Sequence, residues 1–346
     1  HQYSNYVQTL MVASDGSIWF GTLDNGVSRL KDGKWTVFNK AMGVLPNDHV
    51  WSILEVVRDG LGSVFWIATH DVLVRMENGK WKYFTTQNAS LPANQVRALV
   101  ETRNREGSSV VWVGTERGLV RIEGENWRVY TTGNSALPNQ EIVALAPSID
   151  GNHALWVGTE DGFARLEDDS WRVYKTNNSP IPHKSGYSIL ETVSAQSGKC
   201  LWVGTNGGGL ARFEGGKWTT FDTTSAGLPS NNIRSLLETR YNENASILWI
   251  GLNAGGVVQF EYGKWIKFDT RFGGLKSDNI RALMESVEDG VCSFWFCTYD
   301  GLTRYRNNQW TTFTPDNCGV PNKSVSSVLR TGGCLIQVTL LYRIIE

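Results

Sequence analysis

Tryptophan spacing is the feature that most restricts what this chain can fold into. Of the 15 tryptophans in the 346-residue sequence, only Trp51 lies outside two regular columns. The first column recurs every 44 to 47 residues and consists of Trp19, Trp66, Trp112, Trp156, Trp202, Trp249 and Trp295. The second column follows the first by 15 or 16 residues and consists of Trp35, Trp81, Trp127, Trp171, Trp218, Trp265 and Trp310. The chain therefore contains seven copies of one unit.

Each copy has the pattern of four short strands. In the third copy, Val96–Thr102 alternates apolar and polar residues, which is typical of a strand with one buried face. The β-rich run Val110–Thr115 indicates a fully buried strand. The turn Gly124–Asn126 then joins two further strands, Leu119–Ile122 and Trp127–Tyr130. A repeat of this length made from four strands is typical of one blade of a β-propeller.

We therefore predict an all-β fold, a β-propeller of four-stranded antiparallel blades that forms a single domain over residues 1–346. Each blade needs its neighbours to bury its two faces, so the repeats should fold together. The blades are expected to start near residues 7, 50, 96, 142, 186, 233 and 280. First-column tryptophans should pack between blades, whereas second-column tryptophans, which open the outer strands, should be partly exposed.

The C-terminal segment 324–346 adds a partial repeat. Ser324–Thr331 has the pattern of an inner strand and Cys334–Thr339 that of a second strand, but no tryptophan follows either of them. We favour seven complete repeats plus an incomplete eighth, whose outer strand would precede His1. The alternative is a closed seven-bladed ring with the C-terminal segment outside it.

Charge and composition exclude several classes of function. The 33 basic and 34 acidic residues nearly balance, which argues against nucleic acid as a partner. No apolar run is long enough to span a bilayer, so we expect no membrane contact by this domain itself. The five cysteines and five histidines show no metal-ligand spacing, and we predict no metal, no cofactor and no catalytic residue. A Cys318–Cys334 disulfide is left open.

Two sequence elements recur at fixed offsets along the chain. One is the run Leu201–Thr205 (LWVGT), which is followed by Leu210–Arg212 (LAR). The other is the crossover between blades, of which Leu228–Asn231 (LPSN) is an example. From Ser4 to about Asp316, these elements resemble the two-component-regulator propeller repeat of bacterial sensor proteins. Three residues depart from that repeat. Ala68 and Cys297 replace the glycine of W-x-G-T, and Val72 stands where a later glycine is expected.

This resemblance implies a sensory, ligand-binding domain of a bacterial signal-transduction protein, in the periplasm or elsewhere outside the cytoplasm. In that family such propellers usually belong to histidine kinases, hybrid regulators or diguanylate cyclases. No kinase or cyclase sequence occurs here, so the chain would be the sensor portion. Residues Ser14–Trp19 are also similar to the Asp-box of sialidases, but the other repeats do not share that motif.

The second residue of each inner strand is the main candidate for ligand binding. These residues should enter near the propeller axis on the face that carries the crossovers and the turns after W-x-G-T, and loops on a rigid scaffold often carry function. The distinctive members of this set are Trp51, Arg97, Tyr187, Arg234 and Arg281, beside Gln8, Val143 and Ser326. We expect four further residues on the same face, namely His49, His183, Lys184 and Asn232.

The chemistry of these residues suggests the ligand. Arginine forks bind carboxylates, phosphates or sugar hydroxyls, and aromatic rings supply stacking surfaces. We therefore predict a funnel that binds a small polar or anionic molecule, an oligosaccharide being one candidate. The alternative is that the arginines lie between blades and pair with glutamates, such as Glu101, Glu191, Glu238 and Glu285.

Three functions could use this face. We favour a non-enzymatic sensor of a small-molecule or oligosaccharide ligand. The second is a scaffold that binds a partner protein, for which Trp51 would be an interface hot spot. The third is a lyase or glycosidase. Glycoside hydrolysis needs two carboxylates that face each other, and the inner strands begin with arginines instead, which argues against it.

Overall fold

The computed structural model describes residues 6–313 except 33, 59, 61, 150–152, 195–197, 243–244, 289–290 and 299, together with 324–325 and 329–330. These described residues form strands and turns, with no helix among them. They divide into two compact units. A three-blade unit contains the first, second and seventh blades, and a four-blade unit contains the third to the sixth.

The strands of the three-blade unit are β1 (Tyr6–Val12), β2 (Ile18–Thr22), β3 (Val27–Lys31), β4 (Lys34–Phe38), β5 (Val50–Arg58), β6 (Gly62–Thr69), β7 (Leu73–Glu77), β8 (Lys80–Phe84), β25 (Ile280–Glu288), β26 (Val291–Thr298), β27 (Gly301–Arg306) and β28 (Gln309–Phe313). The strands of the four-blade unit are β9 (Val96–Arg103), β10 (Ser109–Thr115), β11 (Gly118–Glu123), β12 (Asn126–Tyr130), β13 (Ile142–Pro147), β14 (Leu155–Thr159), β15 (Gly162–Glu167), β16 (Ser170–Tyr174), β17 (Gly186–Ser194), β18 (Gly198–Thr205), β19 (Leu210–Glu214), β20 (Lys217–Phe221), β21 (Ile233–Asn242), β22 (Ala245–Leu252), β23 (Val257–Glu261) and β24 (Lys264–Phe268).

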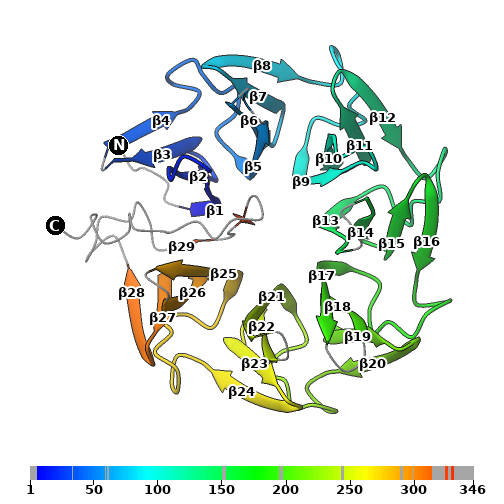
Figure 1. Cartoon of the computed structure of the whole chain (residues 1–346), viewed down its shortest axis with the longest axis vertical. Coiled ribbons are helices and arrows are strands. Elements are labelled where there is room, and N and C mark those ends of the chain that lie inside the picture. Colours follow the sequence, from blue (N-terminus) through cyan, green and yellow to red (C-terminus); the bar gives the residue numbers. More distant parts are fainter. Residues whose placement is uncertain are drawn as a thin grey trace. The chain divides into compact units, whose positions relative to one another are not determined.

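Within every blade, four strands pair in chain order, and the pairs with described registers are antiparallel. We call the first strand of a blade its inner strand and the fourth its outer strand. In the four-blade unit, the inner strands β9, β13, β17 and β21 lie on one side of the blades and the outer strands on the other (Figure 1). The predicted fold class is confirmed: the described residues form seven four-stranded antiparallel blades of an all-β propeller.

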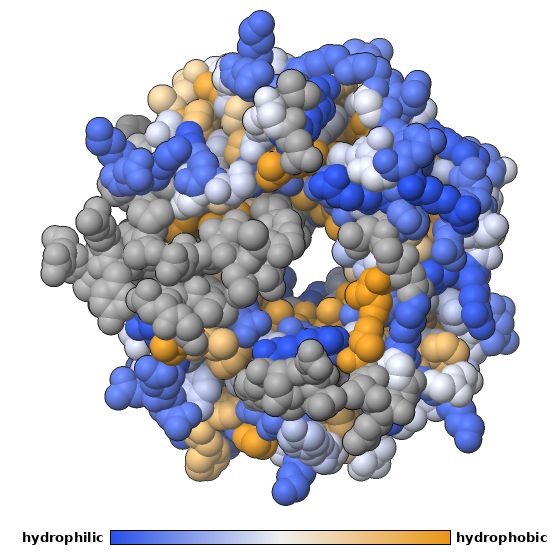
Figure 2. Space-filling view, viewed as in Figure 1, coloured by the Kyte–Doolittle hydropathy of each residue, from blue (hydrophilic) through white to orange (hydrophobic). Residues whose placement is uncertain are grey.

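The inner strands begin close to the expected residues. Their first residues are Tyr6, Val50, Val96, Ile142, Gly186, Ile233 and Ile280. Hydrophilic residues cover the outer strands β12 and β16 on the face shown in Figure 2, as the amphipathic pattern of an edge strand requires. That all of residues 1–346 form one domain stays a prediction.

The C-terminal partial repeat is described only at two short strands, β29 (Ser324–Val325) and β30 (Leu329–Arg330). Both pair in parallel with β1, where Tyr6 lies opposite Ser324 and Met11 opposite Leu329. They extend the first blade beyond its inner strand. The remainder of 324–346 lies outside the described residues, as do Cys318 and Cys334 with their possible disulfide.

The two tryptophan columns differ in burial as predicted. Every first-column indole is at most 5% exposed, whereas the described second-column indoles are half-buried. A second-column ring packs against the aromatic residue that ends the outer strand of the preceding blade. In two examples the ring centroids lie 5.6 Å apart for Tyr130 and Trp171 and 5.2 Å apart for Phe221 and Trp265. The second-column tryptophans therefore help to pack one blade against the next.

The glycine of W-x-G-T is required by the same close packing. A Cβ atom on Gly114 would lie 2.7 Å from Cγ2 of Ile142, the first residue of the next inner strand. A Cβ atom on Gly204 would lie 2.5 Å from Cγ2 of Ile233, again in the next blade. Real Cβ atoms do not approach this closely, so a larger residue at either site forces the blades apart.

The crossovers between blades are tied at both ends. Their leucine or isoleucine is buried in each case, at Leu45, Leu91, Leu137, Ile181, Leu228 and Leu275. The asparagine of L-P-x-N accepts a hydrogen bond from the start of the crossover, from the Thr86 amide to Asn94 (2.7 Å) and from the Thr223 amide to Asn231 (2.8 Å). The middle of a crossover projects into solvent, where Met42 is 64% and Phe272 is 80% exposed.

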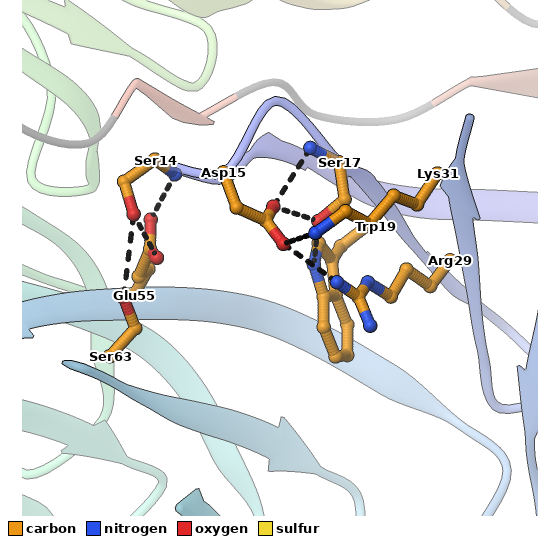
Figure 3. Close-up of polar contacts among 8 residues, drawn as sticks. All are labelled: Ser14, Asp15, Ser17, Trp19, Arg29, Lys31, Glu55 and Ser63. Atoms are coloured by element: carbon orange, nitrogen blue, oxygen red, sulfur yellow. Dashed lines mark hydrogen bonds and ion pairs between the residues drawn. The ribbon is translucent and has the colours of Figure 1, made fainter. Parts of the chain in front are cut away.

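The Asp-box-like segment forms the turn between β1 and β2. Asp15 Oδ1 accepts hydrogen bonds from the Ser17 amide (2.9 Å) and hydroxyl (2.5 Å), and Ser17 Oγ accepts one from the Trp19 indole (3.0 Å). Asp15 Oδ2 is paired with Arg29 and Lys31, each at 2.7 Å (Figure 3). The motif therefore holds a turn above a buried tryptophan, and its carboxylate is fully occupied.

A glutamate of the inner strand joins neighbouring blades on this side. Glu55 of β5 is 1% exposed and accepts hydrogen bonds from the Ser14 amide (2.6 Å) and hydroxyl (2.7 Å) of the first blade (Figure 3). Glu191 of β17 does the same for the Ser148 hydroxyl at 2.6 Å. These glutamates accept hydrogen bonds from a neighbouring turn, which explains why a charged residue is tolerated there.

Candidate ligand-binding surface

Two of the predicted ligand-binding residues meet on adjacent inner strands of the four-blade unit. Tyr187 is the second residue of β17 and Arg234 the second residue of β21. The guanidinium carbon of Arg234 lies 4.8 Å from the centroid of the Tyr187 ring, in cation–π geometry. Equivalent positions on adjacent inner strands thus bring an aromatic face and a cation together.

A carboxylate that the sequence analysis did not single out completes this cluster. Glu160 Oε1 accepts a hydrogen bond from the Tyr187 hydroxyl (3.1 Å), and Oε2 accepts one from the Ser185 hydroxyl (2.8 Å). Glu160 directly follows Thr159, the threonine of W-x-G-T. This position in the sequence could have identified Glu160 as a candidate, because we expected the turn after W-x-G-T to lie on the same face as the crossovers.

The environment keeps the Tyr187 phenol protonated. Burial raises the pKa of Tyr187, and the charge and hydrogen bond of Glu160 raise it further, while Arg234 opposes the rise. Tyr187 is therefore a neutral hydrogen-bond donor at physiological pH. Its hydroxyl is held by Glu160, so its ring is fixed as a platform beneath Arg234.

Arg234 has no ion-pair partner among the residues that the structure describes. Its Nε atom is buried without a hydrogen-bond partner there. A guanidinium presents up to five N–H donors in a planar fork. The guanidinium lies against the Tyr187 ring and forms no ion pair with a described residue, so its N–H donors suit a planar anion. This is the feature that most directly suggests ligand binding.

The neighbouring crossover contributes His183 and Lys184. His183 Nδ1 accepts a hydrogen bond from the Ser185 amide (3.1 Å), so its ring orders its own loop. Lys184 is exposed, and its carbonyl oxygen accepts a hydrogen bond from the Gly162 amide. A Cβ atom on Gly208 would lie 2.6 Å from the Cβ atom of His183, so this glycine lets the next turn pack against the loop.

Arg97 and Asn232 have different surroundings. Arg97 of β9 forms an ion pair with Glu141, which precedes the inner strand of the next blade. The backbone of Asn232 is engaged on both sides, because its amide donates to Ser230 Oγ (3.2 Å) and its carbonyl accepts from the Asn253 amide (2.9 Å). Arg97 therefore joins blades, as the alternative interpretation of the arginines proposed.

Two of the glutamates named in that alternative have described partners other than these arginines. Glu191 binds Ser148, and Glu238 pairs with Arg240 of its own strand at 2.9 Å. Burial raises the pKa of Glu101, which lies further along the same strand, β9, as Arg97. Arg97 therefore does form an ion pair between blades, but the carboxylate belongs to Glu141 of the crossover and not to a glutamate of an inner strand.

The three-blade unit holds a second group of predicted residues. The rings of His70, His49 and Trp51 form a stack, with centroids 5.6 Å apart for the two histidines and 4.3 Å apart for His49 and Trp51. Burial lowers the pKa of His49, and His70 lowers it further. Arg281 is the half-buried second residue of β25 in the same unit. The side chains of Gln8 and Ser326 lie outside the described residues.

The described ranges of the chain contain neither a metal-binding cluster nor a paired thiol. There, no three His, Cys, Asp or Glu side chains are arranged to hold a metal ion. Cys200, Cys292 and Cys297 are free thiols. The same ranges contain no helix of the length and hydrophobicity needed to cross a bilayer.

Comparison with known proteins identifies the repeat. The family described as "Two component regulator propeller" matches residues 4–24. This match is confined to one repeat unit at the start of the chain. The W-x-G-T glycine lets adjacent blades approach closely, and the L-P-x-N asparagine closes the crossover loop, so both motif residues serve the fold. A comparison with curated protein sequences finds no match.

Solved structures with similar folds come from several kinds of protein. One is described as the extracellular domain of a one component system from B. thetaiotaomicron, at 16% identity and a TM-score of 0.58 over 90% of this chain and 46% of that one. Another is an ancestral GH74 enzyme, at 12% identity and a TM-score of 0.66 over 89% and 46%. A third is BBS1N in complex with ARL6DN, at 11% identity and a TM-score of 0.57 over 88% and 92%. This chain spans about half the length of the first two proteins. Its similarity to all three is one of fold.

Proposed function

We propose that this chain is the sensory, non-enzymatic propeller of a bacterial signal-transduction protein outside the cytoplasm, and that it binds a small anionic or polar ligand on the Tyr187–Arg234 surface. The observation that carries the binding proposal is the Arg234 guanidinium, stacked at 4.8 Å on Tyr187 and without an ion-pair partner among the described residues. An arginine without an ion-pair partner is suited to a carboxylate, a phosphate or a sugar hydroxyl.

The sensory role is supported by the propeller repeat and by fold similarity to the extracellular domain of a one component system. A ligand can signal only if it binds one arrangement of the parent protein better than another. Arg234 and Tyr187 belong to adjacent blades, so an anion that bridges them would act on the contact between these blades.

An enzymatic role on this surface has less support. Of the carboxylates described above, Glu141 is neutralised by Arg97, which leaves Glu160 as the single carboxylate bonded to Tyr187. A glycosidase needs one carboxyl group as acid and a second as base or nucleophile across the substrate.

A thermal-shift screen of the purified chain against organic acids, phosphorylated compounds and oligosaccharides tests the proposal. A ligand present at 100 times its Kd should raise the Tm on the order of 5 °C, because it binds only the folded state. Arg234→Gln should abolish that shift. The matched control is Arg172→Gln, since Arg172 also stacks on a tyrosine of this unit, Tyr174 at 5.5 Å, but on an outer strand.

The proposal fails if the ligand shifts the Tm of the Arg234→Gln protein as much as that of the wild type. A panel without any responding compound, together with a stable complex recovered with a partner protein, would favour the scaffold function instead.

A further inference from the structure

The negative charge of Glu160 has no cationic partner among the residues that the structure describes. Both of its oxygens accept hydrogen bonds, but the donors are the neutral hydroxyls of Tyr187 (3.1 Å) and Ser185 (2.8 Å). A carboxylate offers about four acceptor sites, so roughly two remain open. Glu160 is half-buried, which leaves it less screened than a fully exposed side chain.

Glu160 and Arg234 approach the same tyrosine from two directions. Glu160 holds the hydroxyl group, and Arg234 covers the ring face. A ligand whose anionic group lies against the edge of Arg234 therefore places the rest of its body near a second, negative charge. A donor group on the ligand would gain a hydrogen bond at Glu160, whereas a second anionic group would be repelled.

We propose that this surface selects small carboxylates that also carry an amino or hydroxyl group, that is, amino acids and hydroxy acids, and that Glu160 excludes dianions. The inference rests on the anion-binding function proposed above for Arg234. Lys184 acts in the opposite direction, but it is exposed, and solvent and salt weaken its attraction for a second anionic group.

The probes for the experiment are acetate, glycolate, glycine and malonate at equal ionic strength. Each is titrated into the wild-type chain at pH 7.5, and the Nε–H signal of Arg234 is followed by NMR, with Arg234→Gln to assign that signal. Glycolate and glycine should bind more tightly than acetate. Malonate should bind about fivefold more weakly than glycolate, from repulsion by one uncompensated carboxylate.

Glu160→Gln removes the charge and keeps an acceptor oxygen for one of the two hydroxyls, while its NH2 group can donate to the oxygen of the other. It should therefore abolish the fivefold deficit of malonate. The matched control is Glu116→Gln, because Glu116 follows the W-x-G-T threonine of the third blade and is half-buried as well. That control should leave the order of affinities unchanged.

The outcomes separate the two proposals. If none of the four probes moves the Arg234 signal, anion binding at this surface is wrong and the selectivity falls with it. If the probes bind but malonate equals glycolate in the wild type, or Glu160→Gln leaves the malonate deficit in place, only the selectivity is overturned.

Discussion

At the scale of single residues, tryptophan and arginine face each other across two strands in most blades. The first-column tryptophan lies directly opposite the arginine of G-L-x-R, as in the pairs Trp66 with Arg75 and Trp202 with Arg212. The guanidinium carbon lies over the indole at 5.8 Å and 5.6 Å in these two pairs. In the sixth blade Gln259 replaces the arginine opposite Trp249. The repeated arginine therefore covers a buried ring and is a structural residue.

Arg75→Ala should lower the free energy of unfolding by about 1–2 kcal/mol, because it removes cation–π contact and the packing of the side-chain stem. Arg75 also pairs with Glu77 at 2.6 Å, and its side chain is only 14% exposed. Urea denaturation measures the change. The control is Arg105→Ala, whose 73% exposed side chain pairs with Asp168 and should contribute less than about 0.5 kcal/mol. Equal effects of the two variants would contradict this account.

His49 should make the stability of the fold depend on pH. Its pKa is lowered from the usual 6.5 by burial and by His70, against the opposing influence of Asp24 and Asp71. The unfolded chain therefore binds a proton more readily than the folded one. The stabilising contribution is complete above pH 6.5 and is lost as the pH falls below that value.

His49→Gln should flatten the decline of unfolding free energy between about pH 7 and pH 5, as measured by urea denaturation at each pH. His70→Gln removes the like-charge neighbour, so NMR titration should show the pKa of His49 moving upward toward its usual value. A His49 pKa that stays the same without His70 would contradict the assigned cause.

At the scale of strands and turns, the second strand of each blade sets the distance to the next blade. Gly204→Ala should destabilise the fold by about 1–3 kcal/mol, since the added methyl group would clash with Ile233 and Ser188. Gly133→Ala is the control, because a Cβ atom there meets only Thr131 Oγ1 at 3.7 Å. Differential scanning calorimetry should show a lower Tm for the first variant and an unchanged or slightly higher one for the second.

These elements were predictable from sequence because their signals are periodic. The tryptophan columns placed β2 and β4 and their equivalents, and the alternation of Val96–Thr102 placed β9. The contrast between buried first-column and half-buried second-column rings was also predictable, since an outer strand has a strand of its own blade on one side only.

The contacts of the candidate surface could not be predicted in the same way. The partner of Arg97 is Glu141, 44 positions away, and the partner of Tyr187 is Glu160, 27 positions away. Such pairs depend on how adjacent blades are shifted relative to each other, and no residue pattern within one repeat records that shift. The position of a residue along its inner strand predicted the face on which it lies, but not the residue that it contacts.

At the scale of the whole molecule, repeating and non-repeating residues have separate roles. The residues that recur hold turns, cover rings or fasten neighbouring blades. The candidate surface is formed where the repeat varies, at the second position of the inner strand, which is Tyr187 in β17 and Arg234 in β21. A search for ligands should therefore target the variable positions rather than the motif.

The thiols provide a test of how well the fold protects its interior. Burial raises the pKa of Cys200 to about 12, and burial also raises the pKa of Cys297 well above its usual value. Both should resist a thiol reagent in the native protein and react only on unfolding, as followed by mass spectrometry of labelled peptides. Cys292 is partly exposed and should react first. Rapid labelling of Cys200 in the native state would contradict the packing described for β18.

The tie at the ends of each crossover has an evolutionary consequence. One buried leucine and one asparagine or aspartate secure the loop, as Leu91 and Asn94 do, while most residues between the start of the loop and the leucine are exposed. Mutations in the middle of a crossover are therefore close to neutral for folding. Met42 and Phe272, which are large and apolar, occupy such exposed positions. A lineage can change what this protein touches by substitutions in its crossovers, while the inherited framework of blades remains the same.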